Sequence, residues 1–127
     1  MKDYRHLLQN ASESGVYRLN CPVEDLRDSV ESSGFLLFDA DITDAQGKGE
    51  VLAVLARTIQ APEWFGHNWD ALADALGDLS WKEAPGYVLL LKGAKFAPDD
   101  YETLNSILKA TVSFWKLQGK AFWVFFA

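Results

Sequence analysis

The chain has 127 residues, of which 49% are hydrophobic and 24% are charged, and its formal net charge is −6. This length can bury one hydrophobic core and leaves little prospect of a second, so we expect a single domain spanning residues 1–127. The acidic balance argues against nucleic acid or an anionic membrane as the partner and suits a basic protein.

The cysteine content and the lengths of the apolar segments predict where in the cell the protein is found. The single cysteine, Cys21, cannot form an internal disulfide, which is compatible with a reducing compartment. The first 15 residues contain no apolar run of the length found in signal peptides. No segment approaches the roughly 20 apolar residues of a membrane-spanning helix. We therefore expect a cytoplasmic protein with no membrane contact, monomeric when free.

The first third of the chain predicts a strand, a helix and a second strand. Residues 15–19 (GVYRL) predict a short strand at the edge of a sheet. Apolar residues recur at helical spacing over 23–32, and Gly34 is placed to end this helix. Residues 34–38 (GFLLF) form a continuous apolar run, which is typical of a strand buried on both faces.

Two helices are predicted in the middle of the chain. The first has apolar residues at helical spacing and ends before Pro62: Val51, Leu52, Leu55 and Ile59. The second runs from about Asn68 to Leu76, and the Asn68 side chain is a plausible N-terminal cap.

The last third predicts two more strands around a long helix. A buried strand is expected near 87–91, and Pro98 is well placed in the first turn of a helix that Gly119 ends. The inner face of this helix is predicted to contain Leu104, Leu108, Thr111, Val112 and Trp115. Residues 121–127 (AFWVFFA) are nearly all apolar, which predicts a central strand. Because strands separated by helices pair in parallel, the chain predicts a small α/β fold with a parallel sheet.

An acidic helix is the clearest functional feature. Asp70 and Asp74 lie four residues apart, so they share one side of their helix. That side points away from the predicted apolar face. No Lys or Arg occurs from Thr58 to Trp81. Like charges at this spacing destabilise a helix by roughly 0.2–0.5 kcal/mol, and Asp74 is too deep in the helix for the dipole to offset this. An ordinary solvated face is one interpretation, and a binding site for a basic partner is the other.

Catalytic and metal-binding interpretations have little support. The chain contains no dinucleotide or phosphate-binding glycine motif. Cys21 would need His6 or His67 beside it to act as a nucleophile, and a structural thiol is the better interpretation. A metal site at His67, Asp70 and Asp74 lacks a fourth ligand at suitable spacing. We expect no catalytic residue, no metal and no cofactor, and therefore no enzyme.

The segment PEWFGHNWDALADAL, from Pro62 to Leu76, resembles the signature of the barstar family, small intracellular inhibitors of microbial ribonucleases. In that family an aromatic loop precedes a Gly, an Asn and a helix with two aspartates at i,i+4. The remaining predicted elements follow the family's order over residues 34–127. The resemblance implies a three-stranded parallel sheet packed with helices. Residues 1–33, with their predicted strand and helix, lie outside that pattern, and we expect them to be an N-terminal elaboration of the same domain.

The resemblance also implies a site and a partner. Asp74 would enter the active site of a basic ribonuclease or ribonuclease-like toxin, and Asp70 would support it. Trp64 would be the aromatic contact of the loop, and Trp81 would lie beside the binding surface. The full set of expected partner-binding residues is Trp64, Phe65, Gly66, His67, Asn68, Asp70, Asp74 and Trp81. A bacterial antitoxin or immunity role follows from this implication.

Several residues have a second interpretation. Trp64 and Trp81 also suit the core, Gly66 a turn, and Asn68 a helix cap. Ala73 stands where the best-known family member has a Trp. Phe114 stands on the predicted long helix, near the position where that member has an acidic residue at the rim of its interface. These departures imply a different target surface. The alternative function is a regulatory or scaffold module that binds another basic protein without inhibiting a nuclease.

Overall fold

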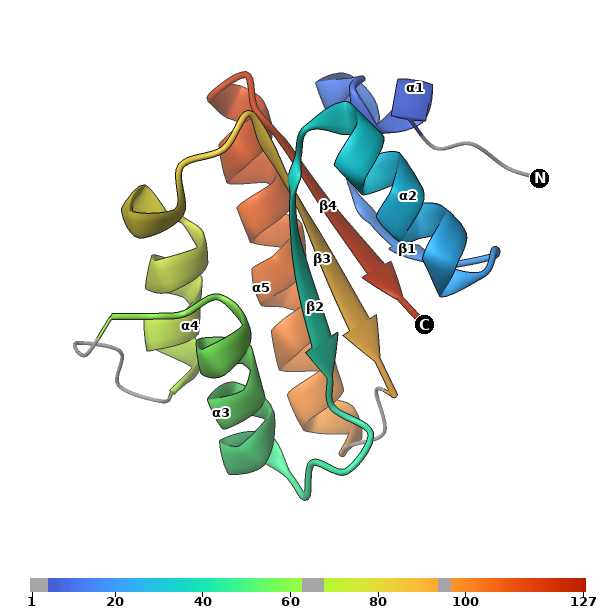
Figure 1. Cartoon of the computed structure of the whole chain (residues 1–127). Helices are drawn as coiled ribbons and strands as arrows, with labels where there is room; N and C mark the ends of the chain where they lie inside the picture. Colours follow the sequence, from blue (N-terminus) through green and yellow to red (C-terminus); the bar gives the residue numbers. More distant parts are fainter. Residues whose placement is uncertain (1–4, 63–67, 94–96) are drawn as a thin grey trace.

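The computed structural model describes residues 5–62, 68–93 and 97–127, with side chains from Leu7 onward. Figure 1 shows a sheet flanked by helices. The helices are α1 (Arg5–Leu8), α2 (Val23–Ser33), α3 (Lys48–Thr58), α4 (Trp69–Leu76) and α5 (Pro98–Leu117), with 3-10 turns η1 (Ala11–Glu13) and η2 (Ser80–Lys82). The strands are β1 (Val16–Arg18), β2 (Leu36–Asp41), β3 (Gly86–Lys92) and β4 (Ala121–Phe126).

The four described strands form one parallel sheet in the order β1-β4-β3-β2. Val124 of β4 lies opposite Val16 of β1 on one side and Leu89 of β3 on the other. The prediction of a central final strand and of an edge strand near 15–19 is confirmed. The expected three-stranded sheet corresponds to β4-β3-β2, and β1 is the additional strand.

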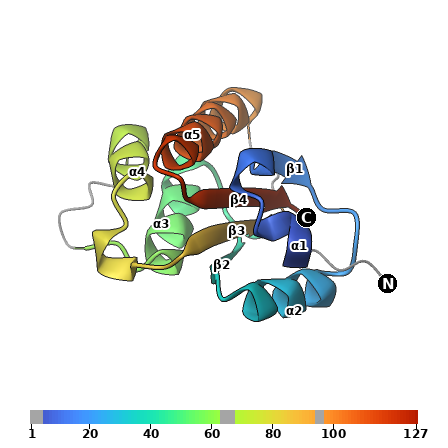
Figure 2. The ribbon, with the colours of Figure 1, turned by 90° about the horizontal axis from the view of Figure 1, so that it is seen from above.

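Helices cover both faces of the sheet (Figure 2). Alternate residues of β4 point to opposite faces, as the twofold period of a strand requires. Phe122, Val124 and Phe126 join the core beneath α3, α4 and α5, which also contains Tyr87 and Leu89. Trp123 and Phe125 join a smaller core with residues of α1 and α2. Both faces of the central strands are therefore buried, in agreement with their unbroken apolar sequence.

The segment before β2 supplies the second apolar layer. Leu8, Leu26 and Val30 are buried against β3 and β4. The Trp123 indole Nε1–H donates a hydrogen bond of 2.9 Å to the Leu8 carbonyl, so this buried polar group is satisfied. Without these residues, the Trp123 side of β4 would be exposed to water.

The helix ends follow the predicted signals, whereas one strand boundary does not. Gly34 follows α2 with φ of 79°, and Pro98 occupies the first turn of α5. The expected strand at 34–38 instead begins at Leu36 and extends to Asp41. The unbroken apolar run ends at Phe38, but the strand continues as an alternation in which Ala40 is buried and Asp39 and Asp41 are exposed, and its backbone stays paired with β3. No described helix is long and apolar enough to cross a membrane.

Candidate functional site

Helix α4 presents the acidic residues on a well-anchored backbone. Asn68 Oδ1 accepts a hydrogen bond of 2.7 Å from the Ala71 backbone N–H, which confirms Asn68 as the N-terminal cap. On the inner side, Leu72 and Leu76 are fully buried or nearly so. The Trp115 Nε1–H of α5 donates a hydrogen bond of 2.8 Å to the Leu76 carbonyl and ties the end of α4 to α5.

The outer side of α4 carries an exposed acidic row, which we define as Asp70, Asp74 and Asp78. Asp70 and Asp74 belong to the helix, and Asp78 follows its last residue by two positions. Within the described part of the chain, no Lys, Arg or His side chain lies within ion-pair distance of these carboxylates. Lys120, which follows α5, is 3.9 Å from Glu83 instead. The acidic row is thus not neutralised by the described residues.

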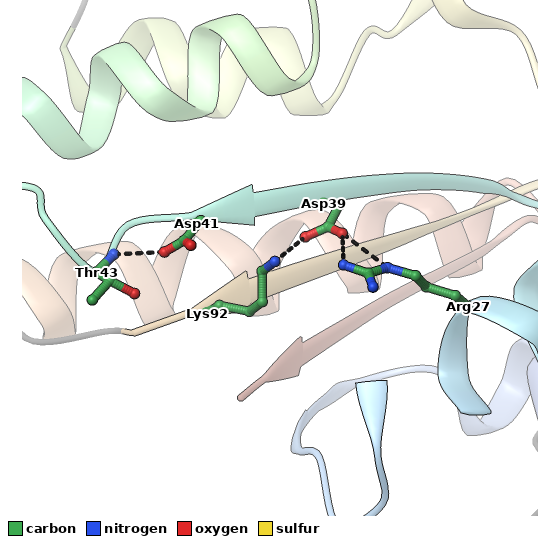
Figure 3. A network of polar contacts seen from close by, with 5 residues as sticks. All are labelled: Arg27, Asp39, Asp41, Thr43 and Lys92. Atoms are coloured by element: carbon green, nitrogen blue, oxygen red, sulfur yellow. Dashed lines mark hydrogen bonds and ion pairs between the residues drawn. The ribbon is translucent and has the colours of Figure 1, made fainter. Parts of the chain in front are cut away.

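The carboxylates of β2 are partnered quite differently (Figure 3). Arg27 of α2 donates to Asp39 Oδ2 through Nε and Nη2, and Lys92 Nζ lies 3.1 Å from Asp39 Oδ1. Desolvation alone would raise the pKa of Asp39, but the hydrogen bonds and charges of Arg27 and Lys92 outweigh it and lower this pKa. Hydrogen bonds from Thr43 lower the pKa of Asp41. This network links α2, β2 and β3 and is structural.

Trp81 joins η2 to the end of α3. Its indole Nε1–H donates a hydrogen bond of 2.9 Å to the Ile59 carbonyl, and its half-buried ring packs against the main core. Ile59 lies just before the segment that leads to α4. Trp81 therefore fixes where that segment starts, and part of its ring remains accessible.

Backbone strain occurs before and after the part of the chain that contains α4. Among described non-glycine residues, Gln60 and Leu79 have positive φ values, 54° and 50°. This region is sterically unfavourable for residues with a Cβ. Gln60 precedes the segment that leads to α4, and the buried Leu79 follows α4. Surrounding contacts must hold both conformations in place.

A groove lies between α4 and α5, next to the acidic row. Its volume is about 380 Å³, and Ala73 and Gly77 form its α4 wall. Residues of α5 form the other wall, including Ile107, Ala110 and Phe114. No lining residue is charged. Ala73 and Gly77 each follow an aspartate of the acidic row by three residues, so on a helix they are its immediate neighbours.

Other polar clusters offer less chemistry. A second cavity of about 400 Å³ is lined by residues that include Asp41, Glu50 and Arg57. Glu50 Oε2 accepts a hydrogen bond from the Gln46 backbone N–H, so this carboxylate is used locally. Within residues 5–62, 68–93 and 97–127, no three His, Cys, Asp or Glu residues are grouped to hold a metal ion. Cys21 Sγ donates a weak hydrogen bond of 3.4 Å to the adjacent Pro22 carbonyl.

Comparison with protein families adds a decisive observation. Residues 35–127 match the model of the family described as barstar, barnase inhibitor. This match covers most of the chain. The chain belongs to the barstar family. No curated protein matches its sequence.

Membership of the barstar family places the acidic helix in an inhibitor family whose partners are ribonucleases. The match begins one residue after the predicted start of the family core at Gly34. It therefore leaves α1, β1 and α2 outside the matched region. Those elements cover the second face of the sheet, as described above.

Four of the expected barstar-type contact residues, Trp64, Phe65, Gly66 and His67, lie outside the described residues. The structure brings Asp70 and Asp74 together on one exposed side of α4. Trp81 follows α4 in the chain and bonds to Ile59, which precedes the segment that leads to α4, and Asn68 is used as a cap. Sequence reasoning missed the α4–α5 groove, although Ala73 and Phe114, which line it, were the two departures from the family pattern.

Proposed function

We propose that this barstar-family protein binds and blocks the active site of a basic ribonuclease or ribonuclease-like toxin. The observation that carries the proposal is the acidic row, which is exposed and has no described basic neighbour. Asp74 is the principal contact, Asp70 supports it, and the Trp64–His67 segment and Trp81 flank them. The protein acts as a cytoplasmic antitoxin, monomeric when free, with residues 1–127 folded as one domain.

The physical basis is mimicry of phosphate. A ribonuclease binds RNA phosphates with Arg, Lys and protonated His in a positively charged concave site. A carboxylate can accept two parallel hydrogen bonds from a guanidinium, much as a phosphate does. Asp70 and Asp74 are four residues apart, which corresponds to a rise of about 6 Å along the helix axis. The two carboxylates can therefore occupy neighbouring phosphate positions.

Preorganisation strengthens such an inhibitor. The Asn68 cap and the Trp115–Leu76 hydrogen bond hold α4 at both ends, and its buried leucines fix its rotation. Less conformational entropy is then lost when the partner binds. The positive φ values at Gln60 and Leu79 also support this proposal, because strained residues tend to cluster at functional sites.

Long-range attraction is the second advantage. With a net charge of −6, the protein attracts a basic partner and raises its association rate. The same charge disfavours nucleic acid and anionic membranes as partners. The half-buried ring of Trp81 can exclude water next to the charged contacts, which raises the energetic value of each contact.

The test is inhibition of RNA hydrolysis by a panel of purified basic microbial ribonucleases, barnase among them. We expect the chain to inhibit at least one of them at a 1:1 ratio, and the double variant Asp70→Asn/Asp74→Asn to lose inhibition. Asp78→Asn, which removes one charge of the same row outside the helix, is the matched control and should inhibit almost normally. Binding of a basic protein without any loss of its ribonuclease activity would instead support the scaffold alternative.

A further inference from the structure

The α4–α5 groove suggests what the partner presents beside its basic site. Its lining is uncharged, and its volume of about 380 Å³ is at the lower end of the roughly 300–1,000 Å³ range of ligand sites. That size suits one or two side chains rather than a cofactor. Thr111 forms a buried part of the lining, while Ala73, Ala110 and Phe114 remain exposed.

Exposed apolar surface extends beyond the groove along α5. Phe114 is 41% exposed, and Leu117, one turn further on, is 87% exposed. Large apolar side chains on neighbouring turns form a continuous patch, unlike isolated exposed residues, which are common. The patch lies on the side of α5 that faces the groove.

Charge is arranged asymmetrically around this patch. On the α4 side, Asp70 and Asp74 are helical neighbours of Ala73 and Gly77. On α5, Lys109 and Lys116 point roughly 100–160° away from Ala110 and Phe114 around the helix. A side chain entering the groove therefore has carboxylates beside it and no lysine of α5 facing it.

We propose that the groove receives an apolar side chain, preferably aromatic, from the target protein, next to an Arg or Lys that pairs with Asp74. The proposal deepens the function proposed above and rests on it. Through charge complementarity, the acidic row selects a partner with a basic residue. The uncharged groove then selects an apolar residue of the partner next to that basic residue. An aromatic ring can also pack edge-on against Phe114.

This contact would determine specificity. The acidic row attracts any basic ribonuclease, whereas the groove distinguishes targets that carry an apolar residue beside the active-site cation. Such a residue becomes fully desolvated between α4 and α5, which is the environment typical of interface hot spots. Ala73 is essential to this arrangement, because a larger side chain there would fill the groove.

The direct test uses small probes and NMR of the full-length ¹⁵N-labelled protein. The probes are the capped dipeptides N-acetyl-Phe-Arg-amide, N-acetyl-Gly-Arg-amide and N-acetyl-Phe-Glu-amide. We expect saturable shifts of the Ala73, Gly77 and Ala110 amides with Phe-Arg, and at least tenfold weaker binding of the other two. Equal binding of Phe-Arg and Gly-Arg would overturn the proposal, because the acidic row alone would then explain it.

Matched variants locate the probe. Ala110→Trp fills the groove and should abolish Phe-Arg binding, whereas Lys109→Trp, on the other flank of the same exposed turn, should not. Phe114→Ser removes the apolar wall by a smaller change and should weaken binding at least tenfold, should Ala110→Trp fail to fold. Without any probe, the amide chemical shifts of the groove residues should not change with protein concentration. A concentration-dependent change would show that a second copy of the chain covers the groove, and would also overturn the proposal.

Inhibition assays separate this proposal from the function on which it rests. Loss of inhibition in Ala110→Trp, with inhibition retained in Lys109→Trp, is the expected result. Full inhibition by Ala110→Trp together with loss in Asp70→Asn/Asp74→Asn would overturn the groove contact and leave the inhibitor function intact. Full inhibition by both variants would overturn the inhibitory role of the acidic row as well.

Discussion

The protein uses carboxylates in two opposite ways, at β2 and at α4. Asp39 of β2 has two cationic partners, Arg27 and Lys92, which join three elements of the fold. Asp70 and Asp74 of α4 are exposed, and no described cation lies within ion-pair distance of them. The first arrangement stabilises the folded chain, whereas the second leaves its charge available to another molecule.

This difference indicates which acidic residues to test for function. A partnered carboxylate already satisfies its hydrogen-bonding capacity within the fold, so a partner protein gains little from it. An unpartnered row at helical spacing is mildly destabilising by itself. It is therefore better explained by binding than by stability, as expected where activity limits local stability. We therefore expect substitutions in α4 to affect binding more than stability, and substitutions at Asp39 to affect stability more than binding.

The largest effect is expected for binding through α4. Asp74→Ala should weaken binding to the inhibited ribonuclease by about 2–5 kcal/mol, because it leaves a buried cation of the partner unpaired. Asp78→Ala should change binding by less than about 0.5 kcal/mol, as is typical of exposed charges. Isothermal titration of both variants measures the difference. Equal and small losses would mean that α4 is not the inhibitory element.

Salt should act mainly on association. We expect the association rate to fall at least tenfold between low salt and about 0.5 M salt, where the Debye length is below roughly 5 Å. Dissociation should change less, because desolvated contacts determine it. Stopped-flow measurements give the association rate at each salt concentration. The double variant Asp70→Asn/Asp74→Asn is the control, because its association rate should fall less as salt is added. A salt-independent rate would point to apolar docking on Trp81 and the groove.

Stability should depend on the other acidic region. Asp39→Asn removes the charge that Arg27 and Lys92 share, and should lower the free energy of unfolding by about 0.5–1 kcal/mol. Solvent screens this network, whose side chains are 28–42% exposed, so the loss should be modest. Urea denaturation measures the change. Inhibition should remain intact, and its loss would contradict a purely structural role for Asp39.

The pH dependence follows from the lowered pKa of Asp39. Its contribution is complete above the pKa of the unfolded chain, near 3.8, and is lost as the pH falls through the lower folded value. The stability difference between wild type and Asp39→Asn should thus be constant from about pH 5 to 7 and shrink below about pH 4. Urea titrations at pH 7, 5, 4 and 3 measure it. A difference that persists unchanged at the lowest pH would argue against the ion pairs as its source.

The order of the elements could be predicted from local signals. The seven apolar-rich residues from Ala121 require cover on both faces, so β4 had to be central. Asn68 and Pro98 are local capping signals, and each acts within one turn of its helix. Asp70 and Asp74 could be placed on one exposed side because the helical period alone determines this.

Features that depend on distant residues could not be predicted. The ion pairs of Asp39 depend on Arg27 and Lys92, which lie far apart in the sequence from each other and come together only in the fold. The groove depends on how α4 crosses α5, which the periodicity of either helix does not reveal. Trp81 had two interpretations, and its hydrogen bond to the Ile59 carbonyl shows a structural contact that leaves part of the ring accessible.

The smallest effect tests whether Asp74 is retained despite a cost in stability. Asp74→Asn removes the repulsion from Asp70, and because Asp74 is exposed opposite the buried Leu72 and Leu76, no core contact is lost. The free protein should be unchanged or stabilised by a few tenths of a kcal/mol, while binding to the ribonuclease weakens. Chemical denaturation of both proteins, compared at equal m-value, measures the first effect, and titration with the ribonuclease measures the second. A loss of stability above about 1 kcal/mol would place Asp74 in a structural network like that of Asp39 and remove the contrast between the two acidic regions.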